Sequence, residues 1–159
     1  MPKENTNTAA AFQKLCRQKG LRVTPQRLEI YNVVSGSNQH PDAEMVHRDV
    51  RSRMPNISLD TVYRTLRLLE KYQLVRRLGS AASRDRFDAD NRAHHHFICT
   101  ECGRVMDFFS PALSQSDIPE EAYSIGQPSE LYMEVRGVCS ACAPSKKQQT
   151  NTEERKSSY

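Results

Sequence analysis

Residues 93–107 read AHHHFICTECGRVMD, and residues 137–143 read GVCSACA. Each segment holds a Cys-x-x-Cys pair, and 36 residues separate the two pairs. Two such pairs can supply the four thiolates of a tetrahedral zinc site. The three histidines run into the first pair on a predicted β-strand, so this segment is expected to serve two different metals. The predicted structural zinc ligands are Cys99, Cys102, Cys139 and Cys142.

The composition limits the class of protein. A chain of 159 residues suits one medium domain or two small ones, and 37% apolar content without a run of about 18 apolar residues excludes a membrane span. The polar start, MPKENTNTAA, lacks the apolar core of a secretion signal. We therefore expect a cytoplasmic protein with reduced thiols, in which metal ligation is favoured over disulfides.

The charge is distributed unevenly along the chain. Residues 1–87 hold 16 Lys and Arg against 8 Asp and Glu, a balance of +8, whereas residues 88–159 hold 7 against 11, a balance of −4. A charge excess is compatible with an ordinary solvated surface, but it also favours contact with a polyanion such as nucleic acid. The basic half is the candidate for such contact.

Apolar spacing in the basic half predicts four short helices. The first three are expected from Thr8 to Lys19 with a stop at Gly20, from Pro25 after the cap Thr24, and from near Asp42 to before Pro55. Ser58 opens the fourth. Its apolar face is expected to hold Leu59, Val62, Leu66 and Leu69, and its other side Asp60, Thr61, Arg64, Thr65, Arg67 and Lys71.

An arginine-rich ribbon follows the fourth helix, in which LVRRL and RDRFD are joined by the turn-like GSAAS. Helices followed by such a ribbon predict a winged helix-turn-helix, whose fourth helix would enter a DNA major groove. The predicted DNA-contacting residues are Ser58, Asp60, Thr61, Tyr63, Arg64 and Arg67. The alternative is an ordinary exposed helix with Tyr63 in the core.

The histidines form a second candidate metal site. On a strand, His94 and His96 point to one face and His95 to the other. With Asp88 before them and Asp107 after them, they make a nitrogen and oxygen ligand set, which suits iron, manganese or zinc.

Five motifs together resemble the ferric uptake regulator family of bacterial metalloregulators. They are HPDAEMV from His40, TVYRTLRLL in the fourth helix, RFD ending the ribbon, HHHFICTECGRVMDF, and GVCSAC. The likeness covers roughly Leu15 to Cys142, and within the family it is greatest to the peroxide-responsive repressors.

The resemblance implies an α+β fold, with an N-terminal winged helix-turn-helix over 8–87 and a small α/β metal-binding dimerisation domain over 88–142. Residues 143–159 are polar and are expected to form a disordered tail. The resemblance also implies a regulatory metal, Fe²⁺ or Mn²⁺, and Zn²⁺ on the four cysteines. The implied regulatory ligands are His40, Asp88, His94, His96 and Asp107. Gln73 stands where the family usually has glycine at the end of the recognition helix, which implies a strained left-handed cap.

The resemblance further implies a function. A homodimer would repress transcription from palindromic operator DNA when metal joins the two halves, and oxidation of His40 or His94 by peroxide would release the DNA. The alternative within the family is an iron- or zinc-responsive repressor of metal uptake genes, because iron-sensing relatives commonly carry glutamate at the position of Asp107.

Two other classes compete. A zinc enzyme would use Glu101 or Glu120 as a base, but no HExxH-type pattern places a base beside the ligands. A dithiol redox protein would need a thioredoxin-like strand and helix alternation, which this sequence lacks. We therefore expect a regulator and not an enzyme.

Overall fold

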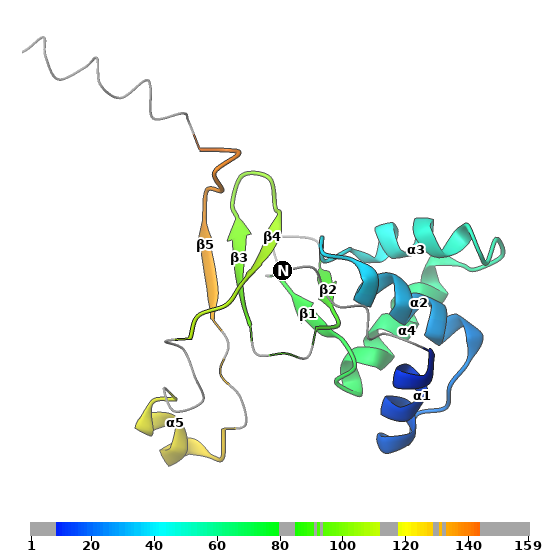
Figure 1. Cartoon of the computed structure of the whole chain (residues 1–159), viewed down its shortest axis with the longest axis horizontal. Coiled ribbons are helices and arrows are strands. Elements are labelled where there is room, and N and C mark those ends of the chain that lie inside the picture. The colour runs from blue at the N-terminus through cyan, green and yellow to red at the C-terminus, as the bar shows by residue number, and fades with distance from the viewer. Residues whose placement is uncertain are drawn as a thin grey trace, which may run out of the picture. The chain divides into compact units, whose positions relative to one another are not determined.

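The computed structural model describes residues 9–79, 85–90, 92, 94–111, 118–128, 131 and 133–143. The chain divides into two compact units, residues 1–93 and 94–159 (Figure 1). The polar segment 144–159, expected to be disordered, and residues 80–84 of the predicted ribbon lie outside the described residues. No helix among the described residues is long and apolar enough to span a membrane.

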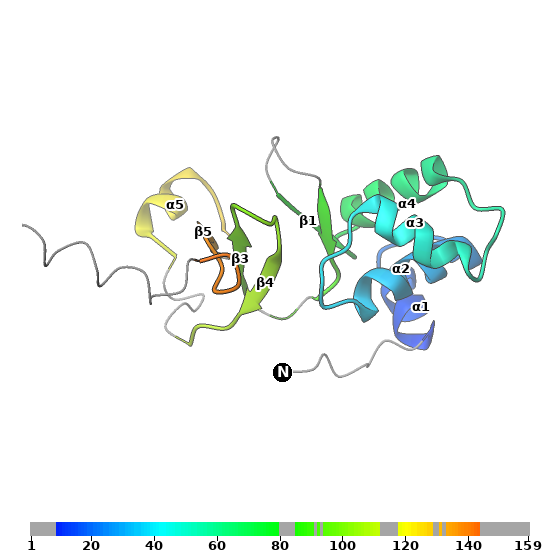
Figure 2. The same ribbon diagram turned by 90° about the horizontal axis from the view of Figure 1, so that it is seen from above.

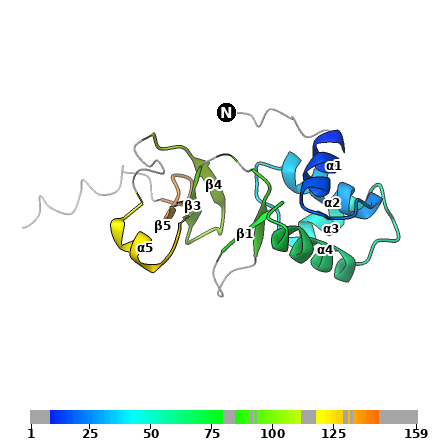
Figure 3. The same ribbon diagram turned by 90° about the horizontal axis from the view of Figure 1, so that it is seen from below.

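The first unit contains four helices and a two-stranded antiparallel ribbon (Figure 3). Its elements are α1 (Ala9–Gln18), α2 (Pro25–Gly36), α3 (Ala43–Arg51), α4 (Leu59–Lys71), β1 (Arg76–Leu78) and β2 (Arg86–Asp88). Three of these helices start at side-chain caps, because Thr24, Asp42 and Ser58 each accept a hydrogen bond from the backbone N–H three residues later.

One apolar core holds the helical unit together. Phe12 of α1 stacks on Tyr31 of α2 with ring centroids 4.6 Å apart. Val62, Leu66 and Leu69 of α4 are fully buried, as their spacing predicted, and Leu59 is half-buried. Thr65 differs from its expected placement on the exposed side, since it is only 8% exposed. The apolar stripe of α4 is therefore wider than the sequence pattern indicated.

Two helices of this unit end in the same backbone motif. After α1, Leu21 N–H donates to the Cys16 carbonyl and Gly20 N–H to the Arg17 carbonyl; after α4, Leu74 donates to Leu69 and Gln73 to Glu70. This is the Schellman motif, which needs a left-handed residue at the turn. Gly20 has φ 67° and Gln73 has φ 54°. The predicted strained cap at Gln73 is confirmed.

The second unit is built on a three-stranded sheet of order β4-β3-β5 (Figure 2). Its strands are β3 (His95–Cys99), β4 (Val105–Phe108) and β5 (Glu134–Gly137), and α5 (Glu120–Ile125) lies between β4 and β5 in the chain. β4 pairs antiparallel with β3, whereas β5 pairs parallel with it. The parallel pairing places Cys99 opposite Gly137, two residues before the second cysteine pair.

Candidate metal centres and nucleic-acid interface

The four cysteines converge at the ends of β3 and β5. Cys99 ends β3, and Cys102 follows in a tight turn in which Gly103 has φ 66° and donates its N–H to the Cys99 carbonyl. The second pair is brought to the same end of the sheet because Thr100 N–H donates to the Gly137 carbonyl at 2.9 Å. The four Sγ atoms all lie within 4.8 Å of one another.

The hydrogen bonds of this cluster favour thiolate at one position. The backbone N–H groups of Cys102 and Cys139 point at Cys99 Sγ and lower the pKa of that thiol to about 6. Hydrogen bonds with the thiols of Cys139 and Cys102 raise the pKa of Cys142 to about 12. The shifted pKa values therefore favour thiolate at Cys99 and a protonated thiol at Cys142.

The cluster fits zinc. Tetrahedral Zn–S bonds of about 2.3 Å put sulfur atoms about 3.8 Å apart. Cys102 Sγ lies 4.0 Å from Cys139 Sγ. Four sulfur donors leave no open coordination position, so such a site would be structural.

The histidine strand forms a second donor cluster in the same unit. His94 Nε2 and His96 Nε2 lie 3.0 Å apart, and Asp107 Oδ1 is 3.7 Å from the first and 3.6 Å from the second. The antiparallel pairing of β3 with β4 places Asp107 directly opposite His96. Both imidazoles are almost fully buried. The two imidazole nitrogens and the carboxylate oxygen are close enough to bind one ion together. This mixture of nitrogen and oxygen donors suits a borderline or hard divalent metal.

His95 has a different role from its neighbours. Its Nδ1 accepts a hydrogen bond from the backbone N–H of Met133 at 3.1 Å, and its ring lies 5.3 Å from that of Phe108. His95 is therefore a buried structural histidine, in agreement with the alternation predicted for the strand.

His40 and Asp88 come together in the helical unit. His40 precedes α3, is 1% exposed and has φ 47°, a left-handed conformation that is costly for a residue other than glycine. Asp88 ends β2, is 2% exposed, and holds Oδ1 3.8 Å from His40 Nε2. The His40 imidazole and the Asp88 carboxylate form a further donor set of two residues, in addition to the cysteine cluster and the histidine strand.

Arg86 supports this donor set from outside, and the sequence did not single it out. Its Nη1 donates to the His40 carbonyl at 3.2 Å, and the next residue, Phe87, donates its N–H to the Pro41 carbonyl at 3.1 Å. These two hydrogen bonds from β2 therefore fix the backbone around His40. Only the position of Arg86 within the RFD motif hinted at such a role.

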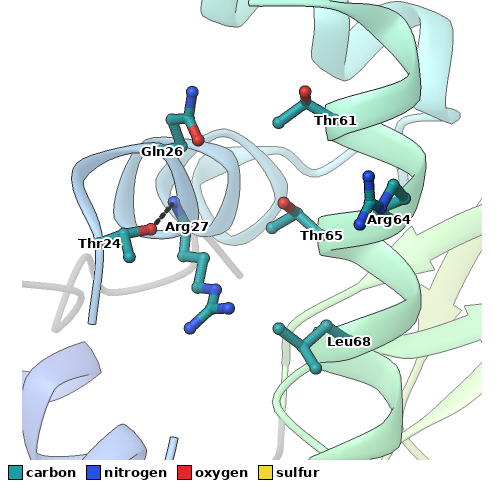
Figure 4. Close-up of a pocket in the computed structure, with 7 residues that line it drawn as sticks. All are labelled: Thr24, Gln26, Arg27, Thr61, Arg64, Thr65 and Leu68. Atoms are coloured by element: carbon teal, nitrogen blue, oxygen red, sulfur yellow. Dashed lines mark hydrogen bonds between the residues drawn. The ribbon is translucent and has the colours of Figure 1, made fainter. Parts of the chain in front are cut away.

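The predicted DNA-contacting residues occupy the start and the exposed face of α4. Tyr63, Arg64 and Arg67 are exposed. The Ser58 hydroxyl accepts from Thr61 N–H at 3.1 Å and lies 2.8 Å from Thr61 Oγ1, so it caps the helix. Asp60 Oδ2 lies 3.8 Å from Arg64 Nη1, an i,i+4 ion pair between two exposed side chains. Thr61 and Arg64 also line an open pocket of about 460 Å³ beside the start of α2 (Figure 4).

Comparison with known proteins defines the class. Residues 18–125 match the model of the ferric uptake regulator family, and this is more than half of the chain. The chain belongs to the ferric uptake regulator family. The predicted family and the α+β fold with its four-cysteine cluster are confirmed. The chain is accordingly a metal-dependent transcriptional repressor and not an enzyme, and proteins of this family bind DNA as dimers.

Individual relatives agree. The peroxide-responsive repressor PerR of Staphylococcus aureus is 34% identical over 126 residues, which cover 79% of this chain and 85% of the relative. The protein of the same name from Staphylococcus epidermidis is 33% identical, with 79% and 84% covered. Among solved structures, the Helicobacter pylori ferric uptake regulator Fur has a TM-score of 0.68 at 26% identity, with 86% of this chain and 92% of that chain covered. Fur of Vibrio cholerae has a TM-score of 0.64 at 26% identity, with 80% and 99% covered.

Proposed function

We propose that this chain is a peroxide-sensing repressor whose regulatory ion is Fe²⁺ or Mn²⁺. In this proposal the ion takes ligands from both units, and zinc occupies the four cysteines. The regulatory ligands would be His40, Asp88, His94, His96 and Asp107. The observation that carries the proposal is the buried pair of imidazoles whose Nε2 atoms both lie within 3.7 Å of one Asp107 oxygen.

The ion would act by selecting a conformer. The helical unit carries the predicted DNA-reading helix, and the sheet unit carries most of the donors, so an ion bound to both restricts their relative positions. If only the restricted conformer spaces two α4 helices for a palindromic operator, metal raises operator affinity. Coupling of this kind is typically about 1–3 kcal/mol, or roughly 5–150-fold.

Dimerisation would involve the sheet unit. Several large apolar side chains of this unit are exposed in the single chain: Phe109, Tyr123, Ile125, Leu131, Met133 and Val138. Exposed apolar surface of this extent favours burial against a partner, and a second copy would pair the same surface with itself. A homodimer would present two α4 helices to double-stranded DNA.

Peroxide sensing would use the same ligands. Ferrous iron held by these ligands would supply the reduction of hydrogen peroxide; overall, the O–O bond would break, one peroxide oxygen would be added to a ligand imidazole and the other would leave as water. The buried imidazoles of His94, His96 and His40 are the groups nearest to such chemistry in this proposal, and an oxidised ring would ligate poorly. The Asp107 carboxylate, in place of the longer glutamate, favours this proposal over an iron- or zinc-responsive repressor of metal uptake, and the similarity to the two peroxide-responsive repressors named above supports it.

The central test is His40→Ala. Operator affinity of the zinc-loaded chain is measured by fluorescence anisotropy with and without Mn²⁺. We expect wild type to gain roughly 5–150-fold from Mn²⁺ and the variant to gain nothing. His47→Ala is the control, because His47 bonds the Ile57 carbonyl and lies outside the proposed ligand set. An unchanged Mn²⁺ response in His40→Ala would refute the proposal.

Peroxide treatment separates the two candidate functions. We expect the iron-loaded chain to lose operator binding and to gain an oxygen atom on His40 or His94, detected by peptide mass spectrometry. The manganese-loaded chain should keep both its mass and its affinity. Loss of DNA binding from the iron form with unmodified histidines would instead support a repressor that senses metal alone.

A further inference from the structure

The backbone that follows β2 is folded by two carboxylates in succession. Asp88 ends β2, and His94, the first residue of the sheet unit, follows it by six positions. Asp88 Oδ1 accepts a hydrogen bond from the Asp90 N–H at 2.9 Å, and Asp90 Oδ1 accepts one from the Arg92 N–H at 3.0 Å. In each turn a side-chain oxygen takes the place of a backbone carbonyl, and the second turn begins at the residue where the first ends.

The Arg92 guanidinium closes the second turn. Its Nε lies 3.0 Å from Asp90 Oδ1 and 3.1 Å from Asp90 Oδ2, and its Nη2 lies 2.6 Å from Asp90 Oδ2. The Asp90 side chain is only 7% exposed, whereas that of Arg92 is 54% exposed. A guanidinium that bonds both oxygens of a carboxylate fixes its direction as well as its distance. These three hydrogen bonds and the one from the Arg92 N–H form what is called here the Asp90–Arg92 clamp.

Stability of the fold is a poor explanation for the clamp. An ion pair with a half-exposed arginine contributes little to the free energy of unfolding, because water screens the charges and both side chains lose freedom. The two residues are also only two positions apart, so their bonds tie no distant segments together. What the clamp restricts is the backbone from Asp88 to Arg92, and therefore the direction in which the chain leaves Asp88.

Asp88 connects the clamp to the proposed metal ligands. The Oδ1 atom that accepts from the Asp90 N–H also lies 3.8 Å from His40 Nε2, and both of these side chains are fully buried. A hydrogen bond to a ligand carboxylate orients it, and such supporting groups strongly affect the affinity of metal sites. The Asp90 backbone therefore acts on Asp88 directly, and the clamp fixes that backbone.

We propose that the Asp90–Arg92 clamp positions the regulatory metal site by ordering the backbone from Asp88 to Arg92 before the ion binds. This inference rests on the proposed function, in which one ion binds both Asp88 and His94. An ordered segment has fewer conformations to lose when the ion joins these two ligands, so the ion binds more tightly. Asp90 and Arg92 are accordingly positioning residues and not ligands.

Substitutions in the full-length, zinc-loaded chain test the clamp. Asp90→Asn keeps an acceptor for the Arg92 N–H but removes the charge, and Arg92→Gln removes the guanidinium. We expect each to raise the Kd for Mn²⁺ about tenfold, measured by competition with a fluorescent chelator, with little change in the temperature of unfolding. Arg92→Lys, which keeps the charge without the fork, should restore only part of the affinity. Glu29→Gln is the matched control, because it removes a carboxylate that pairs with the exposed Arg53 elsewhere in the helical unit.

Two further measurements distinguish positioning from a general loss of structure. The double variant Asp90→Asn/Arg92→Gln should bind Mn²⁺ about as well as either single variant, because two groups that act through one contact are not additive. Hydrogen exchange measured by NMR in the chain without Mn²⁺ reports on the segment itself. We expect the Arg92 amide to be protected in wild type and to lose this protection in Asp90→Ala, whereas the amide of residue 90, which donates to Asp88, stays protected.

The outcomes separate this inference from the function on which it rests. If wild type and His40→Ala bind Mn²⁺ equally well, the proposed function fails. If wild type needs His40 but Asp90→Asn and Arg92→Gln bind Mn²⁺ as wild type does, or more tightly, only the clamp is refuted. Additive losses in the double variant, an equal loss in Glu29→Gln, or an unprotected Arg92 amide in wild type would also refute it.

Discussion

Two residues other than glycine have a left-handed backbone within the described ranges, His40 and Gln73. They have this conformation for different reasons. Gln73 is exposed and follows the end of α4, where the Schellman motif requires a positive φ. His40 is buried beside Asp88, where strain of this kind is typical of functional sites.

Replacing Gln73 with glycine should stabilise the protein. Glycine adopts φ 54° without the Cβ clash, so the free energy of unfolding should rise by about 1 kcal/mol. Urea denaturation followed by far-UV circular dichroism measures the change. Gly20→Gln is the matched variant, since Gly20 has φ 67° in the same motif and an added Cβ would meet nothing within 4 Å. It should lose a similar amount, and a neutral effect in both variants would contradict the strain argument.

At the scale of elements, strand β2 is the part of the ribbon that contacts His40. At one end of this short strand, the Arg86 guanidinium donates a hydrogen bond to the His40 carbonyl. At the other end, the Asp88 carboxylate lies beside the His40 imidazole. Any displacement of β2 would therefore move both members of this donor set.

Arg86→Ala should weaken binding of the proposed regulatory metal without unfolding the protein. Groups that orient a metal ligand typically contribute about 10–100-fold to affinity, so we expect at least a tenfold rise in the Kd for Mn²⁺. Competition with a fluorescent chelator measures it, and Arg86→Lys should restore part of the affinity. Arg77→Ala is the control, since Arg77 in β1 pairs with Glu70 and Asp85. Equal Kd values for Arg86→Ala and Arg77→Ala would show that β2 does not position His40.

At the scale of the whole molecule, the two units depend on different sources of stability. The helical unit has a continuous apolar core of side chains from all four helices. The sheet unit has few buried apolar side chains among its described residues, mainly Ile98 and Val105. A small core of this kind commonly needs a structural metal.

Removing the zinc proposed for the four cysteines should therefore unfold mainly the sheet unit. We expect a strong chelator to leave the helical circular dichroism signal largely intact, to abolish dimerisation in sedimentation experiments, and to make protease cleavage concentrate beyond residue 93. Cys102→Ser should reproduce this result without chelator. Loss of the helical signal in step with zinc release would show that the two units unfold together.

Thiol titration at different pH values distinguishes the four cysteines of the proposed zinc site from the buried Cys16 of α1. With zinc bound no thiol should react; after zinc removal four should react, and Cys16 only after denaturation. Burial raises the pKa of Cys16, so its thiol stays neutral at pH 8. A raised folded-state pKa stabilises the fold below the unfolded-state pKa, and this contribution is lost as pH rises through the folded-state pKa. Early reaction of Cys16 in the native protein would contradict its burial.

Sequence alone was sufficient for features set by local spacing. Alternation along a strand puts His94 and His96 on one face, and a Cys-x-x-Cys turn brings two sulfurs together, because both follow from the backbone of a few residues. The helix caps at Thr24 and Ser58 are local in the same sense.

Only the tertiary structure decided features that depend on distant segments. The parallel pairing of β5 with β3 brings Cys139 and Cys142 to the first cysteine pair, and β2 holds His40 through Arg86. Thr65 is also buried beside the start of α2, and the apolar spacing along α4 did not predict this. Side-chain burial and long-range pairing depend on which surfaces meet, and the free energy of those contacts is shared between residues far apart in the chain.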